Sequence, residues 1–251
     1  MKSTKILLAI IFLFGLALRL FKIVELPAIL NRDEAALAYN ALLIKESGLD
    51  EWQNHWPLTF KSFGDYKLPG YPYLLALLFN ILPSNDFSTR LPSVLAGRLL
   101  IKVAFYFAKD VLKVKNKSAL LMSFLITISP VFFFYSRMAF EANLALLFFV
   151  SSLYFLFKNK ASFFLGAVFL FLAVLTYNTA LLLLPFLLPV LIYKIGWRQK
   201  KQWFKPVFLL LLILLWGVFS FYTLATQKSA ITIFNDTTTW ENFAIYRAQF
   251  S

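Results

Sequence analysis

The chain has 251 residues, of which 60% are hydrophobic, and it contains 30 phenylalanines but no cysteine. Its mean hydropathy of +0.72 is high, because in a typical soluble domain only about half of the residues are apolar. Several apolar runs approach the ~20 residues that a helix needs to cross a bilayer. We therefore expect an all-α polytopic membrane protein. The lack of cysteine in this sequence excludes disulfides and thiolate metal sites.

The net charge of +13 arises mainly from short basic clusters between the apolar runs. Cytoplasmic loops of membrane proteins carry such clusters, so the charge argues against a nucleic-acid partner. The first apolar run, residues 6–23, follows a basic start, and no small-residue cleavage site comes after it. We interpret it as an uncleaved helix with a cytoplasmic N-terminus, and not as a signal peptide.

Residues 25–90 form a long polar interval with eight acidic and five basic residues in an otherwise basic protein. This balance suits the external side of the membrane. Within the interval, residues 71–82 are apolar but too short for a span, which favours a re-entrant or interfacial segment. We place the whole chain in one transmembrane domain and expect it to be the N-terminal part of a longer protein. The expected spans are 6–23, 91–108, 119–134, 144–157, 162–176, 181–193 and 207–225.

The adjacent carboxylates Asp33 and Glu34 open a short helix expected at residues 35–44, with Asn31 as its cap. They can be purely structural, because acids stabilise the first turn of a helix and Asn31 with Glu34 matches a capping box. Their position at the external end of the first span favours function. A carboxylate there can act as a general base toward an attacking hydroxyl.

Lys67 stands in the segment GDYKLPGYPY, next to Asp65 and Tyr66. It is either an exposed lysine beside a turn or a ligand for a phosphate group at lipid-headgroup depth. Asp65 and Tyr66 are weaker candidates for contacts to a substrate or a metal. His55, the only histidine, is more often a surface residue than a metal ligand in such a setting. Whether a divalent metal takes part stays open.

Arg137 and Glu141 are four residues apart in YSRMAFEAN and can share a helix face. With the arginine first, an ion pair between them contributes only about 0.3 kcal/mol. An external arginine also runs against the positive-inside bias. We therefore expect Arg137 to face a phosphate and Glu141 a sugar hydroxyl, a metal or Arg137. Arg98 and Lys102 lie inside an apolar run, where charges usually face a cavity or snorkel, and the sequence assigns them no role.

Four motifs in order resemble the bacterial membrane glycosyltransferases of the protein O-mannosyltransferase and aminoarabinose transferase type, which have the GT-C fold. The resemblance covers residues 19–185. The motifs are DEAALAYNALLIKESGLDEW, PLTFKSFGDYKLPGYPYLLAL, TRLPSVLAG and SRMAFEAN.

The resemblance implies a GT-C-like transmembrane helix bundle whose long first external loop carries juxtamembrane helices. It implies transfer of a sugar from a polyprenyl-phosphate donor to a protein, lipid or glycan acceptor, at the external or periplasmic face of the inner (plasma) membrane. The family's acidic base falls on Asp33, with Glu34 beside it, and its donor-phosphate residues fall on Lys67 and Arg137. Two positions depart from the family pattern: Leu68 replaces the first proline of Lys-Pro-Pro, and Glu141 replaces an aspartate.

The chemistry expected from these residues is an inverting transfer. Lys67 and Arg137 would stabilise the charge that develops on the leaving polyprenyl phosphate. Two other functions stay open. The first is a flippase for a lipid-linked sugar with Arg98 and Lys102 along its path, although the inverted repeats typical of transporters are not evident. The second is a non-catalytic membrane scaffold subunit, which would tolerate loss of the Asp33 carboxylate.

Overall fold

The structure, a computed structural model, describes residues 2–62, 65–159, 162–184, 186–187 and 189. The expected span at 207–225 lies outside the described residues, as do residues 185, 188 and 190–193 of the one expected at 181–193. The chain divides into two compact units, one formed by residues 1–56 and 68–183 and the other by 57–67 with 184–251. Each unit is described by itself.

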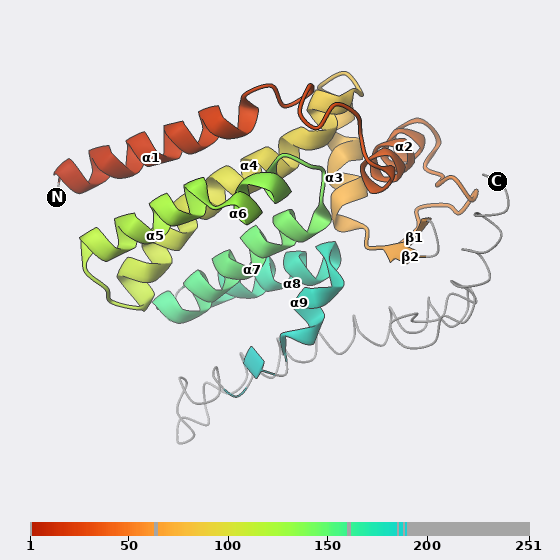
Figure 1. The fold of residues 1–251 in the computed structure, drawn as a ribbon. Coiled ribbons are helices and arrows are strands. Elements are labelled where there is room, and N and C mark those ends of the chain that lie inside the picture. The colour runs from red at the N-terminus through yellow and green to blue at the C-terminus, as the bar shows by residue number, and fades with distance from the viewer. Residues whose placement is uncertain (1, 63–64, 160–161, 185, 188, 190–251) are drawn as a thin grey trace, which may run out of the picture. The chain divides into compact units, whose positions relative to one another are not determined.

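The described part of the chain is mostly helical, which confirms the all-α membrane fold expected from the sequence (Figure 1). Three of its helices are long and apolar enough to cross a membrane. They are α1 (Lys2–Leu20), α4 (Asp86–Tyr106) with its π-helical continuation η1 (Phe107–Val111), and α7 (Glu141–Lys158).

A fourth apolar segment is broken in the middle. Helices α5 (Asn116–Ile128) and α6 (Pro130–Ser136) meet at an angle of 58° and reach span length only as a pair. Pro130 explains the break, because it has no backbone N–H to continue the helical ladder and its ring clashes with the preceding turn. The remaining helices of this unit's membrane part are the shorter α3 (Gly70–Phe79), α8 (Phe163–Thr176) and α9 (Asn178–Leu182).

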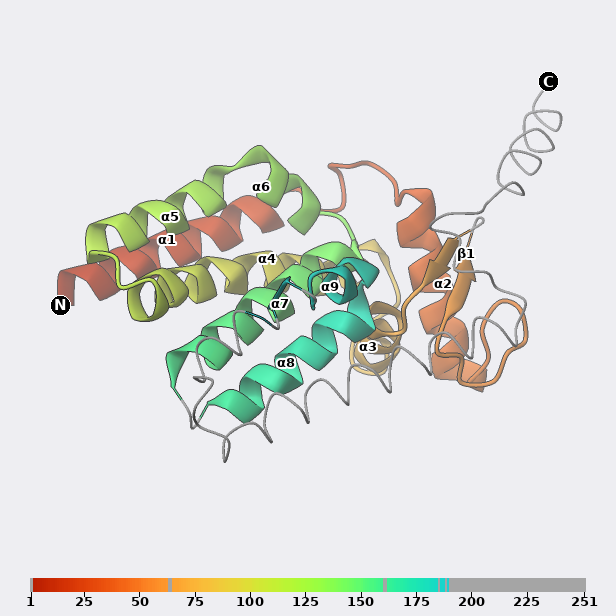
Figure 2. The same cartoon turned by 90° about the horizontal axis from the view of Figure 1, so that it is seen from below.

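Within the larger unit, α1 lies along α4 and α5, and α7 lies along α8 (Figure 2). The seam between α1, α4 and α5 is filled by an apolar cluster of buried residues from all three helices. Its members are Leu8, Ile11, Ile101, Phe105, Ala108, Ala119 and Leu120. Small residues let the helices approach: a Cβ on Gly97 would stand 3.0 Å from the Arg19 Nε and would also meet the Ser136 side chain.

Helix α2 (Arg32–Ser47) lies in the long polar interval and packs against α3. Gly48 ends it in the left-handed conformation (φ 72°), with its N–H donating to the Ile44 carbonyl at 3.0 Å. The following loop is tied back to the helix, since the amide of Asn40 and the Glu51 side chain and backbone exchange hydrogen bonds of 3.1 and 3.0 Å. The sequence had predicted a shorter helix here, at residues 35–44.

The smaller unit contains two antiparallel strands that form a hairpin, β1 (Phe60–Ser62) and β2 (Asp65–Lys67). In its register Phe60 pairs with Lys67 and Lys61 pairs with Tyr66. The hairpin therefore fixes the backbone of all three candidate residues that the sequence singled out in this segment, namely Asp65, Tyr66 and Lys67.

Candidate active site

The N-terminus of α2 presents Asp33 and Glu34 in different environments. Asn31 caps the helix by accepting the Glu34 N–H at 2.9 Å, while the Glu34 carboxylate accepts the Asn31 N–H at 3.0 Å. The capping box expected from the sequence is thus confirmed. Glu34 is fully buried, whereas Asp33, one residue earlier, is half-buried. The two adjacent acids are therefore not equivalent.

The Glu34 carboxylate forms a buried ion pair with Arg90 of α4. The Arg90 Nε donates to one Glu34 oxygen at 3.0 Å and its Nη2 donates to the other at 3.3 Å, with both side chains 0% exposed. The first oxygen also accepts the Ala139 N–H at 2.7 Å, from the segment between α6 and α7. Both Glu34 oxygens thus accept hydrogen bonds, and the donors come from the cap of α2, from α4 and from the segment between α6 and α7.

Arg90 also holds the segment that links α1 to α2. Its Nη1 donates to the carbonyls of Ile23 and Pro27 at 2.7 and 2.9 Å, and its Nη2 donates to the Ile29 carbonyl at 3.0 Å. A buried arginine is stable only when its N–H groups find acceptors, and here the Glu34 carboxylate and three carbonyls supply them. Arg90 thus joins the linker to Glu34, in the same first turn of α2 as Asp33.

Arg137 also binds main-chain carbonyls, at the end of α1 and in the segment that follows it. Its Nη1 donates to the carbonyls of Leu18 and Arg19 at 2.9 and 3.1 Å, and its Nη2 donates to those of Lys22 and Leu26 at 3.1 and 2.7 Å. Only 5% of the residue is exposed. Burial, together with the nearby Arg90 charge, lowers the pKa of Arg137. The open C-terminal carbonyls of a helix suit a cation, which explains the placement.

Glu141 begins α7 and is 4% exposed. Tyr71, at the start of α3, lies close to both Glu141 and Glu34. Burial raises the pKa of the Tyr71 hydroxyl, and the negative charges of the two carboxylates raise it further. The Tyr71 hydroxyl donates to the Thr89 carbonyl at 3.0 Å, next to Arg90. The structure therefore gathers Asp33, Glu34, Arg137 and Glu141, all predicted from the sequence, near the C-terminal end of α1 and the N-terminal ends of α4 and α7 in the larger unit.

Of the other residues predicted from the sequence, Asp65, Tyr66 and Lys67 belong to the smaller unit and His55 belongs to the larger one. Lys67 and Tyr66 are half-buried residues of β2, and Asp65 opens that strand. His55 is exposed in the loop after α2, where its ring stacks on Trp56 at 6.3 Å, and Trp56 stacks on Tyr73 at 6.1 Å. Among the described residues, no three His, Asp or Glu side chains come together as a metal-binding group.

Sequence reasoning missed Arg90 as a site residue. It stands in the motif TRLPSVLAG and was counted only as one of five basic residues in the long loop. The available signal was a lone arginine directly before an apolar run, in a loop that the charge balance predicts to be external and that the positive-inside rule would keep free of arginine. Its acidic partner lies 56 positions away in the sequence, and nothing local connects the two.

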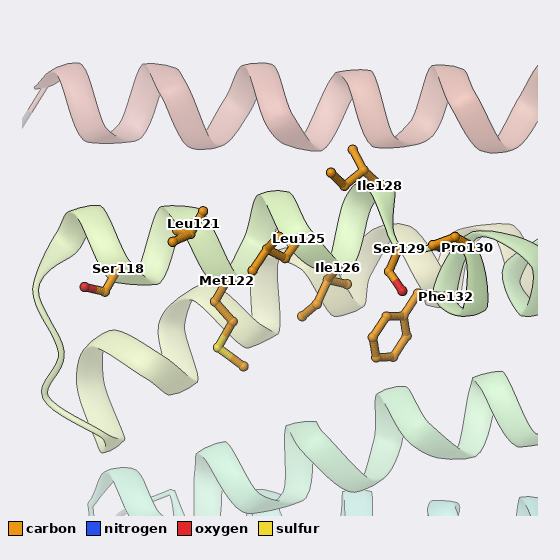
Figure 3. A pocket seen from close by; sticks show the side chains of 9 residues that line it. All are labelled: Ser118, Leu121, Met122, Leu125, Ile126, Ile128, Ser129, Pro130 and Phe132. Atoms are coloured by element: carbon orange, nitrogen blue, oxygen red, sulfur yellow. The ribbon is translucent and has the colours of Figure 1, made fainter.

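A large groove on the membrane part of this unit has no charged group in its lining. It measures about 770 Å³ and lies where α5 gives way to α6, between Ser118 and Phe132 (Figure 3). Apart from the hydroxyls of Ser118 and Ser129, its lining side chains are apolar. Such a surface can accept a hydrocarbon chain, but it offers no group for acid–base chemistry.

The fold defines a polytopic helical membrane protein with a buried charged cluster at one end of its candidate spans. The chain belongs to the dolichyl-phosphate-mannose-protein mannosyltransferase family, whose model matches residues 67–222. The match includes Lys67, Arg90, Arg137 and Glu141, and it begins after Asp33 and Glu34. No curated protein and no solved structure gives a significant match. The family implies glycosyltransferase activity with a lipid-linked sugar donor in a membrane.

Proposed function

We propose that this chain transfers a sugar from a polyprenyl-phosphate donor to an acceptor hydroxyl or phosphate on a protein, lipid or glycan. The reaction takes place at the external face of the inner (plasma) membrane, and the N-terminus is cytoplasmic. The observation that carries the proposal is the half-buried Asp33 carboxylate, held one residue from the buried Glu34–Arg90 pair in a chain of this family. Family membership supports a transferase over a flippase or a scaffold subunit.

In the proposed mechanism Asp33 is the base. It takes the proton of the acceptor hydroxyl as the acceptor oxygen bonds to the anomeric carbon of the sugar, from the face opposite the phosphate. The bond between the anomeric carbon and the phosphate oxygen breaks, and the electron pair leaves on the polyprenyl phosphate. Because that phosphate is already a stabilised anion, no strong general acid is needed. The configuration at the anomeric carbon inverts.

Glu34 has a different role in this proposal. Its two oxygens already accept hydrogen bonds from the Asn31 N–H, Arg90 and the Ala139 N–H. These four hydrogen bonds occupy both carboxylate oxygens and leave them little capacity to accept a further bond from a substrate hydroxyl. We assign it to positioning, since it anchors the first turn of α2 and thereby orients Asp33.

Lys67 and Arg137 are proposed to stabilise the donor phosphate. The four terminal N–H groups of Arg137 donate to main-chain carbonyls, which leaves its Nε–H and its net charge for the phosphate. Lys67 supplies a compact charge on a flexible four-carbon side chain. Glu141 is proposed to accept a hydrogen bond from a hydroxyl of the sugar.

The test is sugar transfer in membranes that contain the protein, using a panel of labelled polyprenyl-phosphate sugars. Asp33→Asn should reduce transfer at least about 10²-fold, the lower range for a general base. The exposed Glu25→Gln is the matched control for loss of one external carboxylate, and it should leave the rate unchanged. Full activity in Asp33→Asn would remove Asp33 as the base. If no donor supports transfer although the protein binds polyprenyl phosphate, the transferase proposal fails in favour of a flippase or a scaffold.

A further inference from the structure

The turn between η1 and α5 carries positive charge at one end of the candidate spans. It joins the span of α4 and η1 to the bent pair α5 and α6, so it lies at a membrane surface. Lys113, Lys115 and Lys117 are all exposed in it. Within the described part of the chain, no ion pair or hydrogen bond engages these three side chains. Asp110, the nearest acid in the sequence, instead accepts a hydrogen bond from the Tyr154 hydroxyl at 3.1 Å.

Exposed apolar side chains alternate with these lysines. Leu112 and Val114 are both exposed, although the turn has only six residues between η1 and Ser118. Segments that lie at a membrane interface combine basic side chains, which meet the lipid phosphates, with apolar ones, which enter the boundary of the acyl chains. The composition and the exposure of the turn therefore suit anionic lipid headgroups.

The large apolar groove along α5 begins directly beside this turn (Figure 3). Ser118 lines its first part, and Lys117 is both the neighbour of Ser118 and one turn before Leu121, which also lines the groove. From Ser118 to Ile128 the groove follows about 15 Å of helix, and it then reaches the bend between α5 and α6. This length is roughly half of a hydrocarbon core of about 30 Å. The groove therefore fits a hydrocarbon chain of one leaflet.

A second, smaller groove of about 380 Å³ lies between α1 and α5. Its lining runs from Leu7 to Phe14 of α1 and from Leu120 to Phe124 of α5, and all of its lining side chains are apolar. Leu121 lines both grooves, so the two lie side by side. Two neighbouring apolar grooves next to one cationic turn match the two acyl chains and the one charged headgroup of a phospholipid.

We infer that the turn and the two grooves bind one anionic phospholipid of the adjacent leaflet. Its phosphate lies against Lys115 and Lys117, one acyl chain follows the larger groove along α5, and the other lies between α1 and α5. The site is at the opposite end of α4 from Arg90. The inference therefore does not depend on the proposed sugar transfer.

Two other occupants fit these observations less well. A polyprenyl phosphate has a single hydrocarbon chain. At the other end of the spans, its phosphate would meet Arg137, whose four terminal N–H groups already donate to carbonyls. A spanning helix must cross the whole core of about 30 Å, whereas the straight part of the larger groove follows only about half of that distance. Neither of these occupants accounts for the lysines at the mouth of the groove.

Native mass spectrometry of the full chain, purified in detergent, measures which lipid it retains. The protein is mixed with equal amounts of phosphatidylglycerol and phosphatidylcholine that carry the same acyl chains, so that only the headgroup differs. Phosphatidylglycerol should be retained at least about tenfold better, because each lysine near anionic lipid strengthens binding about fivefold.

One pair of variants tests the headgroup contact. Lys115→Gln combined with Lys117→Gln should remove most of the preference for phosphatidylglycerol. The charge-matched control is Lys22→Gln combined with Lys102→Gln, which changes two exposed lysines away from the turn and should leave the preference intact.

A second pair of variants tests the larger groove. Leu125→Trp fills it at an exposed lining position and should lower the retention of phosphatidylglycerol at least about fourfold, the effect of one buried CH₂ group. The control Leu99→Trp is exposed on α4 outside both grooves and should change nothing. Each variant is checked for an unchanged unfolding temperature without added lipid.

Four results would overturn the inference. Equal retention of the two lipids would remove the headgroup contact. An equal loss of preference in both lysine variants would mean that only the net charge matters. Unchanged retention in Leu125→Trp would show that the groove holds no lipid, as when another helix covers it. Displacement of phosphatidylglycerol by a tenfold smaller amount of polyprenyl phosphate would assign the groove to the sugar donor.

Discussion

Replacement of Arg90 by glutamine should destabilise the protein strongly. The side chain is 0% exposed and donates five hydrogen bonds, two to Glu34 and three to main-chain carbonyls. Glutamine is shorter, carries no charge, and leaves the Glu34 carboxylate buried without its counter-ion. Removing one partner of a buried ion pair costs about 3–5 kcal/mol. For a chain of this size that corresponds to a drop of about 6 to 20 °C in the unfolding temperature.

The matched control is the exposed pair of Lys22 and Glu25, whose charged atoms are 2.8 Å apart with half or more of each side chain exposed. Exposed pairs contribute about 0–1 kcal/mol, so Glu25→Gln should change the unfolding temperature little. Thermal unfolding of the purified protein in detergent, followed by the tryptophan fluorescence, compares the two variants directly. Equal shifts for Arg90→Gln and Glu25→Gln would refute the reasoning, because burial would then have no bearing on the strength of the pair.

A double-mutant cycle separates the ion pair from the carbonyl contacts of Arg90. Glu34→Gln keeps a side-chain oxygen that can accept from the Ala139 N–H, but it removes the charge that Arg90 faces. If the pair is coupled, the double variant should be less damaged than the sum of the two single variants, by about 0.5–3 kcal/mol. Strict additivity would mean that Arg90 acts through the carbonyls of the linker alone.

Further predictions concern the cap, the end of α2 and the topology. Asn31→Ala removes the acceptor of the Glu34 N–H and should lower stability by about 1 kcal/mol, which thermal unfolding would detect. Gly48→Ala places a Cβ on a residue with φ 72° and should cost about 1–2 kcal/mol in the same assay, whereas a neutral result would show that the turn relaxes. In intact cells, a membrane-impermeant maleimide should label Glu46→Cys but not Lys117→Cys. The reverse pattern would invert the proposed orientation.

The sequence predicts the helical elements of this unit well, because apolar runs and caps are local features. The capping box at Asn31 and Glu34 is readable from four consecutive positions. Residues 119–134 were expected as one span, and the structure instead breaks this segment at Pro130. The exact pairing of buried charges is not local. Glu34 accepts hydrogen bonds from Arg90, 56 positions away in the sequence, and from the Ala139 N–H, 105 positions away. Only the packed helices therefore show that both oxygens of its carboxylate are already hydrogen-bonded.

The hydrogen-bond partners of Arg137 could not be predicted from the sequence either. From the sequence, an external arginine four residues before Glu141 suggested a ligand for phosphate. In the structure its terminal nitrogens are occupied by the carbonyls at the end of α1, more than a hundred positions away. A sequence pattern shows that an arginine needs hydrogen-bond acceptors. The sequence alone does not show which main-chain carbonyls a buried arginine will bind, because every residue type has one.

Arg90 and Arg137 together bind seven carbonyl oxygens of residues 18–29, and these oxygens belong to the main chain. Every amino acid has a main-chain carbonyl, so these hydrogen bonds to the linker do not depend on most of its side chains. A saturation mutagenesis map should therefore be permissive along 20–29 and sharply intolerant at two distant arginines. The shape of the segment that leads to Asp33 is encoded by residues outside the segment itself.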